Sequence, residues 1–330
     1  MNRREFFKTT AIAAAGAATA PLWWGTAAAA DAADPRPIVA FARSGKLIID
    51  DKFALDAKLL REMLGAAVCK VVSETDPRRA WQSLFKPSDV IGIKVNTLAG
   101  GIFSSHARLV EAIADSLRDA GVPAKNIIVW DRLSRELTEA GFPAGAADGK
   151  FRCLGTDGRY SDDINDIVTQ GAIGSFFSTI LTRLCTAQIN VPMLKDHDIA
   201  GVTIGLKNWF GALHNPSKYH FDNLHDAISD VNAVPAIRKQ TRLTICDATR
   251  VVYEGGPGLK PQCLERLGAL LVSRDPVALD AVGCAKIDDL RAAHKLLSLK
   301  AAAREPKAIA LAAAKGLGVA DLKKIEVVTV

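Results

Sequence analysis

One segment constrains the fold more than any other, because residues 90–131 contain two apolar runs with a helical pattern between them. Val90–Asn96 and Ile127–Asp131 are short, largely apolar runs without alternation between apolar and polar positions. The apolar residues between the runs recur at helical spacing: Leu109, Val110, Ile113, Ala114 and Leu117. Strand, helix and strand in this order predict a βαβ unit, and unbroken apolar runs are typical of parallel strands covered on both faces.

Strand and helix patterns alternate through the rest of the chain as well. Further strands are predicted at Ile38–Phe41, Lys46–Ile49, Gln188–Leu194, Arg242–Asp247, Ala269–Ser273 and Ile325–Val330. Further helices are predicted at Leu55–Val72, Gly205–Leu213, Leu224–Arg238, Val277–Lys286 and Pro306–Gly316. Ser104-Ser105 and Asp275 are the expected N-caps of two helices. The alternation predicts an α/β fold with a mostly parallel sheet, built on βαβ units and covered by helices on both faces.

The first thirty residues have the three parts of an export signal. Arg3 and Arg4 lie in a basic start, residues 9–24 are uncharged and rich in Ala, and Ala27–Ala30 offers small-residue cleavage sites. Paired arginines are typical of the twin-arginine (Tat) route. The apolar stretch is shorter than the roughly 20 residues that span a bilayer, so an uncleaved anchor is the weaker alternative. We expect the Tat translocase to export the chain to the periplasm, with no stable membrane span after cleavage.

These patterns divide the chain into three parts. Residues 1–30 are the expected Tat-type signal peptide, residues 31–84 are an N-terminal linker with a strand and helix segment, and residues 85–330 are an α/β domain.

Composition and charge exclude several functions. The 330 residues are 49% hydrophobic and 24% charged, which is typical of a folded globular protein. The formal net charge of +6 comes from scattered residues, whereas nucleic-acid binders concentrate Lys and Arg in patches; no nucleic-acid partner is expected. The six cysteines form no Cys-x-x-Cys pair, which argues against an iron–sulfur cluster. Whether a metal or another cofactor binds stays open.

Polar residues end four of the predicted strands. In an open α/β sheet, ligands bind outside the carboxyl ends of the strands, so we expect these residues to meet in one pocket. They are Lys94, Asn96, Asp131, Lys195, Asp196, His197 and Asp247. Because several of them are basic, the pocket is suited to a small anionic molecule.

Two further features lie after the strand that ends at Leu194. Lys207 stands in an apolar stretch, where burial lowers the pKa of a lysine and makes it a base or nucleophile; a lysine that reaches solvent is the alternative. Imidazole and carboxylate side chains then occur close together, at His214, His220, Asp222, His225 and Asp226. A shared metal site, surface positions and, for His214 and His220, an acid–base role all remain open.

Four segments resemble a known family: Ile93–Asn96, Val191–His197, Gly201–Gly211 and Ser273–Asp280. Their order and their residues, including Lys-x-His followed by Gly-x-Thr-x-x-x-Lys-Asn, resemble the DUF362 family, a domain of unknown function. The resemblance covers roughly residues 85–290. It implies an α/β domain and an association with iron–sulfur proteins, since some members carry a ferredoxin-like module. This sequence lacks the Cys-x-x-Cys repeats of that module, so no cluster is expected.

These features predict a periplasmic, DUF362-like enzyme that acts on a small anionic substrate by Lys/His acid–base chemistry. The expected catalytic residues are Lys94, Lys195, His197, Lys207 and His214. The expected substrate-binding residues are Asn96, Asp131, Asn208, His220 and Asp247. A non-catalytic periplasmic protein that binds, or assists the maturation of, a metal, cofactor or anion in the same pocket is the alternative. The residues alone do not decide whether the chain is an enzyme.

Overall fold

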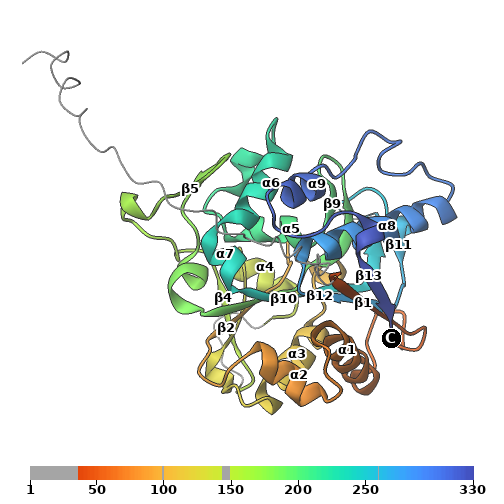
Figure 1. Ribbon diagram of the computed structural model, residues 1–330, viewed down its shortest axis with the longest axis horizontal. Coiled ribbons are helices and arrows are strands. Elements are labelled where there is room, and N and C mark those ends of the chain that lie inside the picture. The colour runs from red at the N-terminus through yellow and green to blue at the C-terminus, as the bar shows by residue number, and fades with distance from the viewer. Residues whose placement is uncertain (1–35, 99, 143–148, 259) are drawn as a thin grey trace, which may run out of the picture. The chain divides into compact units, whose positions relative to one another are not determined.

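A large mixed sheet forms the centre of the protein (Figure 1). The computed structural model describes residues 36–98, 100–142, 149–258 and 260–330, and the predicted signal peptide lies outside them. The strands of the sheet are β1 (Ile38–Arg43), β2 (Ile91–Lys94), β3 (Ile127–Asp131), β4 (Arg152–Gly155), β7 (Ala187–Asn190), β8 (Met193–His197), β9 (Gly201–Thr203), β10 (Thr241–Val252), β11 (Leu264–Glu265), β12 (Ala269–Ser273) and β13 (Glu326–Thr329). A second sheet is the hairpin of β5 (Val168–Gln170) and β6 (Ile173–Ser175).

The large sheet is parallel over the part that contains the predicted βαβ unit. Its main path runs in the order β13-β1-β12-β10-β7-β2-β3-β4. Neighbouring strands from β10 to β4 along this path are parallel. β12 is antiparallel to both β10 and β1, while β1 and β13 are parallel to each other. Off the path, β8 pairs with β10 and β9.

Helices cover both faces of this sheet, which confirms the predicted α/β class. They are α1 (Ala57–Val72), α2 (Pro77–Leu84), α3 (Ala107–Asp119), α4 (Ser134–Glu139), α5 (Gly205–Asn208), α6 (Leu224–Ala233), α7 (Pro235–Gln240), α8 (Pro276–Ala293) and α9 (Ala308–Ala314). Figure 1 shows α1, α2 and α3 below the sheet and α5 to α9 above it. The βαβ unit is present as β2, α3 and β3.

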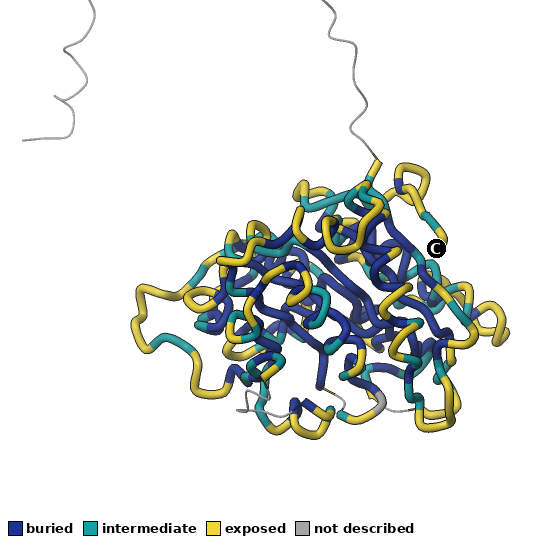
Figure 2. Tube along the Cα trace, turned by 90° about the horizontal axis from the view of Figure 1, so that it is seen from below, coloured by how far each residue is buried: buried dark blue, intermediate teal, exposed yellow. Residues whose placement is uncertain are grey.

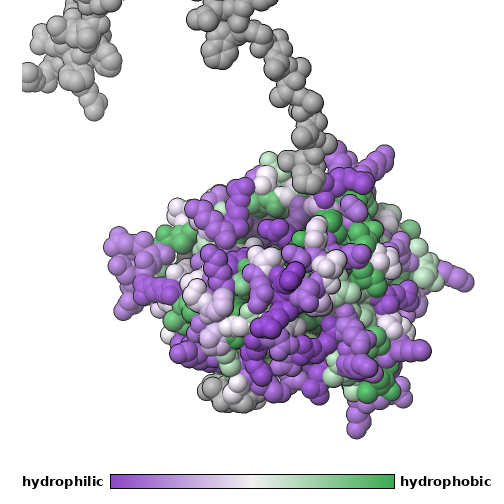
Figure 3. Space-filling model, turned by 60° about the horizontal axis from the view of Figure 1, so that its bottom comes forward, coloured by the Kyte–Doolittle hydropathy of each residue, from purple (hydrophilic) through white to green (hydrophobic). Residues whose placement is uncertain are grey.

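The two largest hydrophobic cores among the described residues lie on opposite faces of the sheet, which explains why the strands are continuous apolar runs. Alternate residues of a strand point to opposite faces of the sheet. In β3, Ile127 and Val129 pack in the core that includes residues of α1, α2 and α3. Ile128 and Trp130 pack in the core that includes residues of α6, α8 and α9. Figure 2 shows buried chain through the middle and exposed loops around it, and the face in Figure 3 is mainly hydrophilic, with smaller hydrophobic patches.

Residues 36–84 belong to the same compact unit as the α/β domain, which spans Arg36–Val330. They contribute β1, α1 and α2, and β1 pairs with β12 and β13. None of the helices described is long and apolar enough to cross a membrane.

Prolines account for two differences from the predicted elements. The predicted strand Gln188–Leu194 is divided between β7 and β8, because Pro192 has no N–H to donate to a neighbouring strand. The predicted helix Leu224–Arg238 is divided into α6 and α7, because the residue before Pro235 is disfavoured in the helical conformation.

The predicted strand Lys46–Ile49 is instead a turn with one isolated bridge, from Ile48 to Leu55. The Ser44 hydroxyl accepts a hydrogen bond from the Lys46 N–H (3.2 Å), and the Leu47 N–H donates to the Ser44 carbonyl (3.2 Å). Local hydrogen bonds of this kind compete with strand pairing.

The N-cap of α3 is His106, not Ser104-Ser105, while Asp275 caps α8 as predicted. The Ser105 hydroxyl instead donates to the Val191 carbonyl (2.7 Å) and accepts from the Asn96 N–H (2.9 Å). Ser105 therefore connects the segments that follow β2 and β7.

Candidate functional site

Three adjacent parallel strands end at one edge of the sheet, where a cavity of about 410 Å³ is found. Lys94, the last residue of β2, is in register with Trp130 of β3 and Asn190 of β7. Residues of β8, β9 and α5 also line the cavity. Eight of the ten predicted site residues line it: Lys94, Asn96, Asp131, Lys195, His197, Lys207, Asn208 and His220. The topology of the sheet thus brings five strand-end residues together, while Lys207, Asn208 and His220 come from α5 and the segment that follows it.

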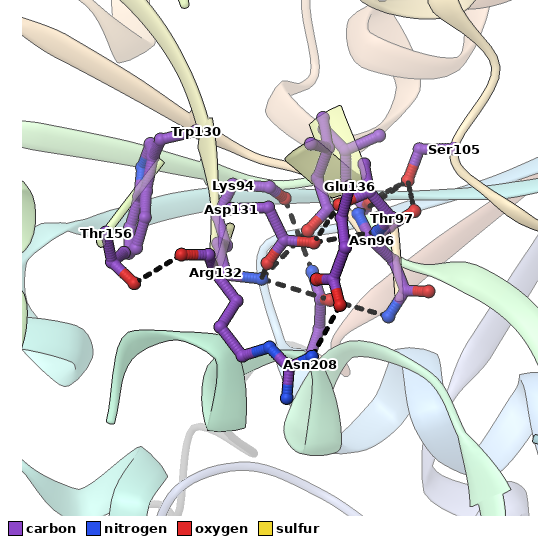
Figure 4. Close-up of polar contacts among 12 residues, drawn as sticks. Lys94, Asn96, Thr97, Ser105, Trp130, Asp131, Arg132, Glu136, Thr156 and Asn208 are labelled. Carbon is purple, nitrogen blue, oxygen red and sulfur yellow. Dashed lines mark hydrogen bonds and ion pairs between the residues drawn. The ribbon is translucent and has the colours of Figure 1, made fainter. Parts of the chain in front are cut away.

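A buried ion pair lies at the end of β2 and β3 (Figure 4). Lys94 Nζ is 2.7 Å from Asp131 Oδ1, and both side chains are almost fully buried. Asp131 Oδ2 accepts hydrogen bonds from the Thr97 N–H (2.7 Å) and hydroxyl (2.8 Å). Burial lowers the pKa of Lys94, and the adjacent carboxylate of Asp131 offsets part of this effect. Because Lys94 has this partner, its charge is largely balanced inside the protein.

Asparagines connect this ion pair to α5. Asn208 Oδ1 accepts hydrogen bonds from Asn96 Nδ2 (3.1 Å) and Lys94 Nζ (3.4 Å), and its Nδ2 donates to Asn190 Oδ1 (2.7 Å). A network in which each amide has partners holds side chains in one orientation. Asn96 and Asn208 are therefore fixed in position at the cavity.

Asp280 of α8 fixes the position of α5 through hydrogen bonds to its first two residues. Its two carboxylate oxygens accept hydrogen bonds from the N–H groups of Gly205 (2.8 Å) and Leu206 (3.0 Å). Complete burial raises the pKa of Asp280 to about 7. The residue caps the helix that carries Lys207 and Asn208, so it supports the cavity without lining it.

Lys195 is a buried cation without a carboxylate partner. It is 1% exposed, and its Nζ donates to Asn96 Oδ1 at 2.8 Å. No described carboxylate lies within 4.0 Å of this nitrogen. Burial lowers the pKa of Lys195 to about 8; the more distant carboxylate of Asp131 offsets part of this effect, and the charge of Lys94 adds to it.

Lys207 is the second such cation, and it pairs with an imidazole. Its Nζ is 3.1 Å from His220 Nε2, and His220 Nδ1 is 2.9 Å from the Pro216 carbonyl oxygen. A carbonyl only accepts, so Nδ1 carries the proton and Nε2 accepts from Lys207. Burial and the charge of Lys195 lower the pKa of Lys207 to about 7. Lys207 is therefore divided between its charged and neutral forms near neutral pH.

His197, on β8, is an uncharged imidazole. Its Nδ1 is 3.3 Å from the Ala200 N–H and 3.4 Å from the Ile199 N–H, and it accepts from both. The same nitrogen lies 2.9 Å from Asp198 Oδ1, whose side chain is largely exposed. Burial and the nearby charge of Lys207 lower the pKa of His197 to about 2. At neutral pH, this side chain offers hydrogen bonds and does not carry a charge.

Arg132, Glu136 and Thr203 also line the cavity, although they were not among the predicted site residues. Arg132 and Glu136 form an ion pair. Arg132 follows β3 directly, so the rule of strand ends would have found it, and Thr203 lies in the Gly-x-Thr motif. Glu136 lies on the short helix α4 and carries no comparable signal in the sequence.

Two predicted site residues do not line the cavity. His214 is exposed and packs edge-on against Tyr160, with ring centroids 4.9 Å apart. Asp247 is fully buried and accepts hydrogen bonds from the N–H groups of His106 (2.7 Å) and Thr249 (2.9 Å). Asp247 sits in the middle of β10 rather than at its end, since β10 continues to Val252.

The charges in the cavity do not balance. Four cations line it, namely Lys94, Arg132, Lys195 and Lys207. Two carboxylates line it, Asp131 and Glu136, and they pair with Lys94 and Arg132 respectively. Lys195 and Lys207 are left without a negative partner among the described residues. Within those residues, no group of three or more His, Cys, Asp or Glu side chains is placed to hold a metal ion.

The fold and the cavity define an α/β protein in which buried cations line a cavity at the carboxyl ends of parallel strands. The chain belongs to the family described as "Domain of unknown function (DUF362)", whose characteristic sequence matches residues 91–285. The matched segment contains all ten predicted site residues.

A crystal structure of a protein from Thermotoga maritima, from a structural genomics consortium, is similar to this chain with a TM-score of 0.43 and 10% sequence identity. The similarity covers 71% of this chain and 59% of that one, so less than two thirds of that protein is matched. No curated protein matches the chain.

Proposed function

We propose that this protein binds a small anionic molecule in the cavity at the strand ends and acts on it by proton transfer through Lys207. The observation that carries the proposal is the pair of buried lysines, Lys195 and Lys207, without carboxylate partners. A buried charge is costly unless it is paired. A bound anion would supply the missing negative charge.

Five residues that line the cavity have roles in this proposal. Lys195 and Lys207 neutralise the anion, and the second N–H group of the Asn96 amide orients it. Both N–H groups of Asn208 are donated within the protein, so Asn208 holds Asn96 and Lys94 in place. His220 accepts one N–H of Lys207, which leaves the other two N–H groups of the ammonium for the ligand. In its neutral form, Lys207 is a base, and in its charged form it returns the proton, as efficient acid–base catalysis near neutral pH requires.

Replacing either lysine with Met tests the binding step. Lys195→Met and Lys207→Met are each expected to weaken binding of inorganic phosphate or acetate by about ten- to hundredfold, because a hydrogen bond to a charged group contributes roughly 1.5–3 kcal/mol. Titration calorimetry at pH 7 measures the affinity. Lys58→Met is the matched control, since the Lys58 side chain is 89% exposed. Unchanged affinity in both cavity variants would show that the anion binds elsewhere.

The acid–base step has a separate readout. A base within reach of a bound carboxylic acid promotes exchange of its acidic C–H hydrogens with D₂O, which NMR detects. We expect exchange with the wild type and none with Lys207→Met. Binding of acids without exchange across a panel of small carboxylic acids would favour the alternative, a non-catalytic protein that binds or matures an anion or cofactor.

We also propose that the chain is exported through the Tat route and works in the periplasm. The support is the sequence of residues 1–30, which lie outside the described residues. Replacing Arg3 and Arg4 together with Lys is expected to leave the protein in the cytoplasm at its precursor size, as measured by cell fractionation. Arg36→Lys, beyond the predicted signal, is the control. Normal export of the paired variant would rule out the Tat route.

A further inference from the structure

The mouth of the cavity differs in chemistry from its floor. Leu98, Phe221 and Pro257 line the outer part, and they come from three separate loops. Leu98 is 50% exposed and Phe221 is 76% exposed. Exposed apolar side chains scattered singly need no explanation, whereas a group of them around a polar site is typical of a ligand-binding groove.

The floor of the cavity contains a hydroxyl group that lacks a hydrogen-bond partner in the protein. Thr203 lines the cavity and is 5% exposed, and its buried hydroxyl has no hydrogen-bond partner in the protein. Thr203 is opposite Lys195 in the antiparallel pair of β9 and β8. An unsatisfied buried hydroxyl is costly, so a ligand atom at the floor would satisfy Thr203 and Lys195 together.

An aromatic wall lies beside the buried lysine. The Phe210 ring is 5.0 Å from Lys207 Nζ and packs edge-on against His220, with ring centroids 5.4 Å apart. Phe210 lines the cavity as Leu98 and Phe221 do. A polar group placed among these apolar side chains would lose hydrogen bonds to water without replacement, whereas an apolar group there would be stabilised by burial.

We propose that the ligand is an amphipathic anion, with a carboxylate or phosphate group at Lys195, Lys207 and Thr203 and an alkyl or aromatic tail that extends past Phe210 to the mouth. This inference rests on the proposed function, and it adds the class of molecule that the cavity takes. A free small molecule is the occupant, since the buried lysines are charged groups that only a slender head group can reach from the surface.

A homologous series of acids tests the tail site. Calorimetry with acetate, butanoate and hexanoate is expected to show affinity rising roughly two- to fourfold for each added methylene, because burial of one methylene contributes about 0.8 kcal/mol at most in such a site. Phenyl phosphate is expected to bind about tenfold or more tightly than inorganic phosphate for the same reason. Hexan-1-ol, which has the tail without the charge, is expected to bind far more weakly than hexanoate.

Substitutions in the protein test the binding of the two ends of the ligand separately. Phe221→Ser and Leu98→Ser are expected to flatten the dependence on chain length while leaving acetate affinity within about twofold. Lys195→Met is expected to weaken the binding of all the acids, while affinity still rises with chain length. Leu297→Ser is the matched control, because Leu297 is 65% exposed and does not line the cavity.

The outcomes distinguish this inference from the proposed function. Equal affinity for acetate and hexanoate, or for phosphate and phenyl phosphate, would overturn the tail site and leave the anion site intact. Failure of every acid and phosphate to bind would overturn both. Binding to anionic lipid vesicles that depends on Phe221, without binding of the soluble acids, would assign the apolar mouth to a membrane surface and overturn the proposal of a free ligand.

Discussion

Lys94→Met is expected to destabilise the protein by about 3–5 kcal/mol, the typical effect of removing one partner of a buried ion pair. The substitution leaves Asp131, which is 4% exposed, as a buried carboxylate whose remaining partners are the N–H and hydroxyl of Thr97. Urea unfolding at pH 7 measures the difference in the free energy of unfolding.

Lys195→Met is the matched comparison for this prediction. It removes a lysine that is equally buried but has no carboxylate partner, so its effect on the free energy of unfolding is expected to be neutral or stabilising. Lys94→Met combined with Asp131→Asn should recover part of the lost stability, because no charge is then buried at the pair. Equal destabilisation by Lys94→Met and Lys195→Met would contradict the assignment of the charges in the cavity.

The stability of the wild type relative to Lys207→Met is expected to rise with pH between about 7 and 10. The pKa of Lys207 is lowered to about 7 in the folded protein, against about 10.4 in an unfolded chain. In this interval the unfolded chain binds more protons, so stability increases with pH. Below pH 7 the wild type carries the full penalty, on the order of 4 kcal/mol, and Lys207→Met is the more stable protein.

Urea unfolding of the wild type and of Lys207→Met across the pH range measures this difference in the free energy of unfolding. The contributions of the other titrating groups are similar in the two proteins and largely cancel. The charged and titratable groups near Lys207 are Lys195, His197, His220 and Asp198. Saturating phosphate should raise the stability of the wild type more at pH 6 than at pH 9, because the anion binds the charged form of Lys207. A difference that does not change with pH would show that Lys207 keeps an ordinary pKa.

The sequence predicts the centre of the sheet and the floor of the cavity well, because both depend on where the buried parallel strands lie and end. Apolar runs such as Ile127–Asp131 have few alternatives to a buried parallel strand. Strands that are parallel and adjacent must end at the same edge, so Lys94 and Asp131 could be expected to meet.

Other features depend on contacts between distant residues, which local patterns do not encode. Asp247 follows an apolar run, yet β10 continues beyond it. Its carboxylate accepts a hydrogen bond from the His106 N–H and does not line the cavity. His214 is close in sequence to His220, but it lies on the surface beside Tyr160. That Lys195 and Lys207 are buried without a carboxylate within ion-pair distance follows from tertiary geometry alone.

The pairing of Lys195 with Thr203 across one hairpin has a consequence for selectivity. Facing residues of an antiparallel pair keep their Cβ atoms about 4.5–5.5 Å apart, and the backbone rather than a flexible loop maintains this separation. The fixed separation of the two Cβ atoms therefore limits the size of the charged group that fits between Lys195 and Thr203. A change of ligand preference would require a different strand register, so we expect the head-group preference to be harder to alter by substitution than the preference for a tail.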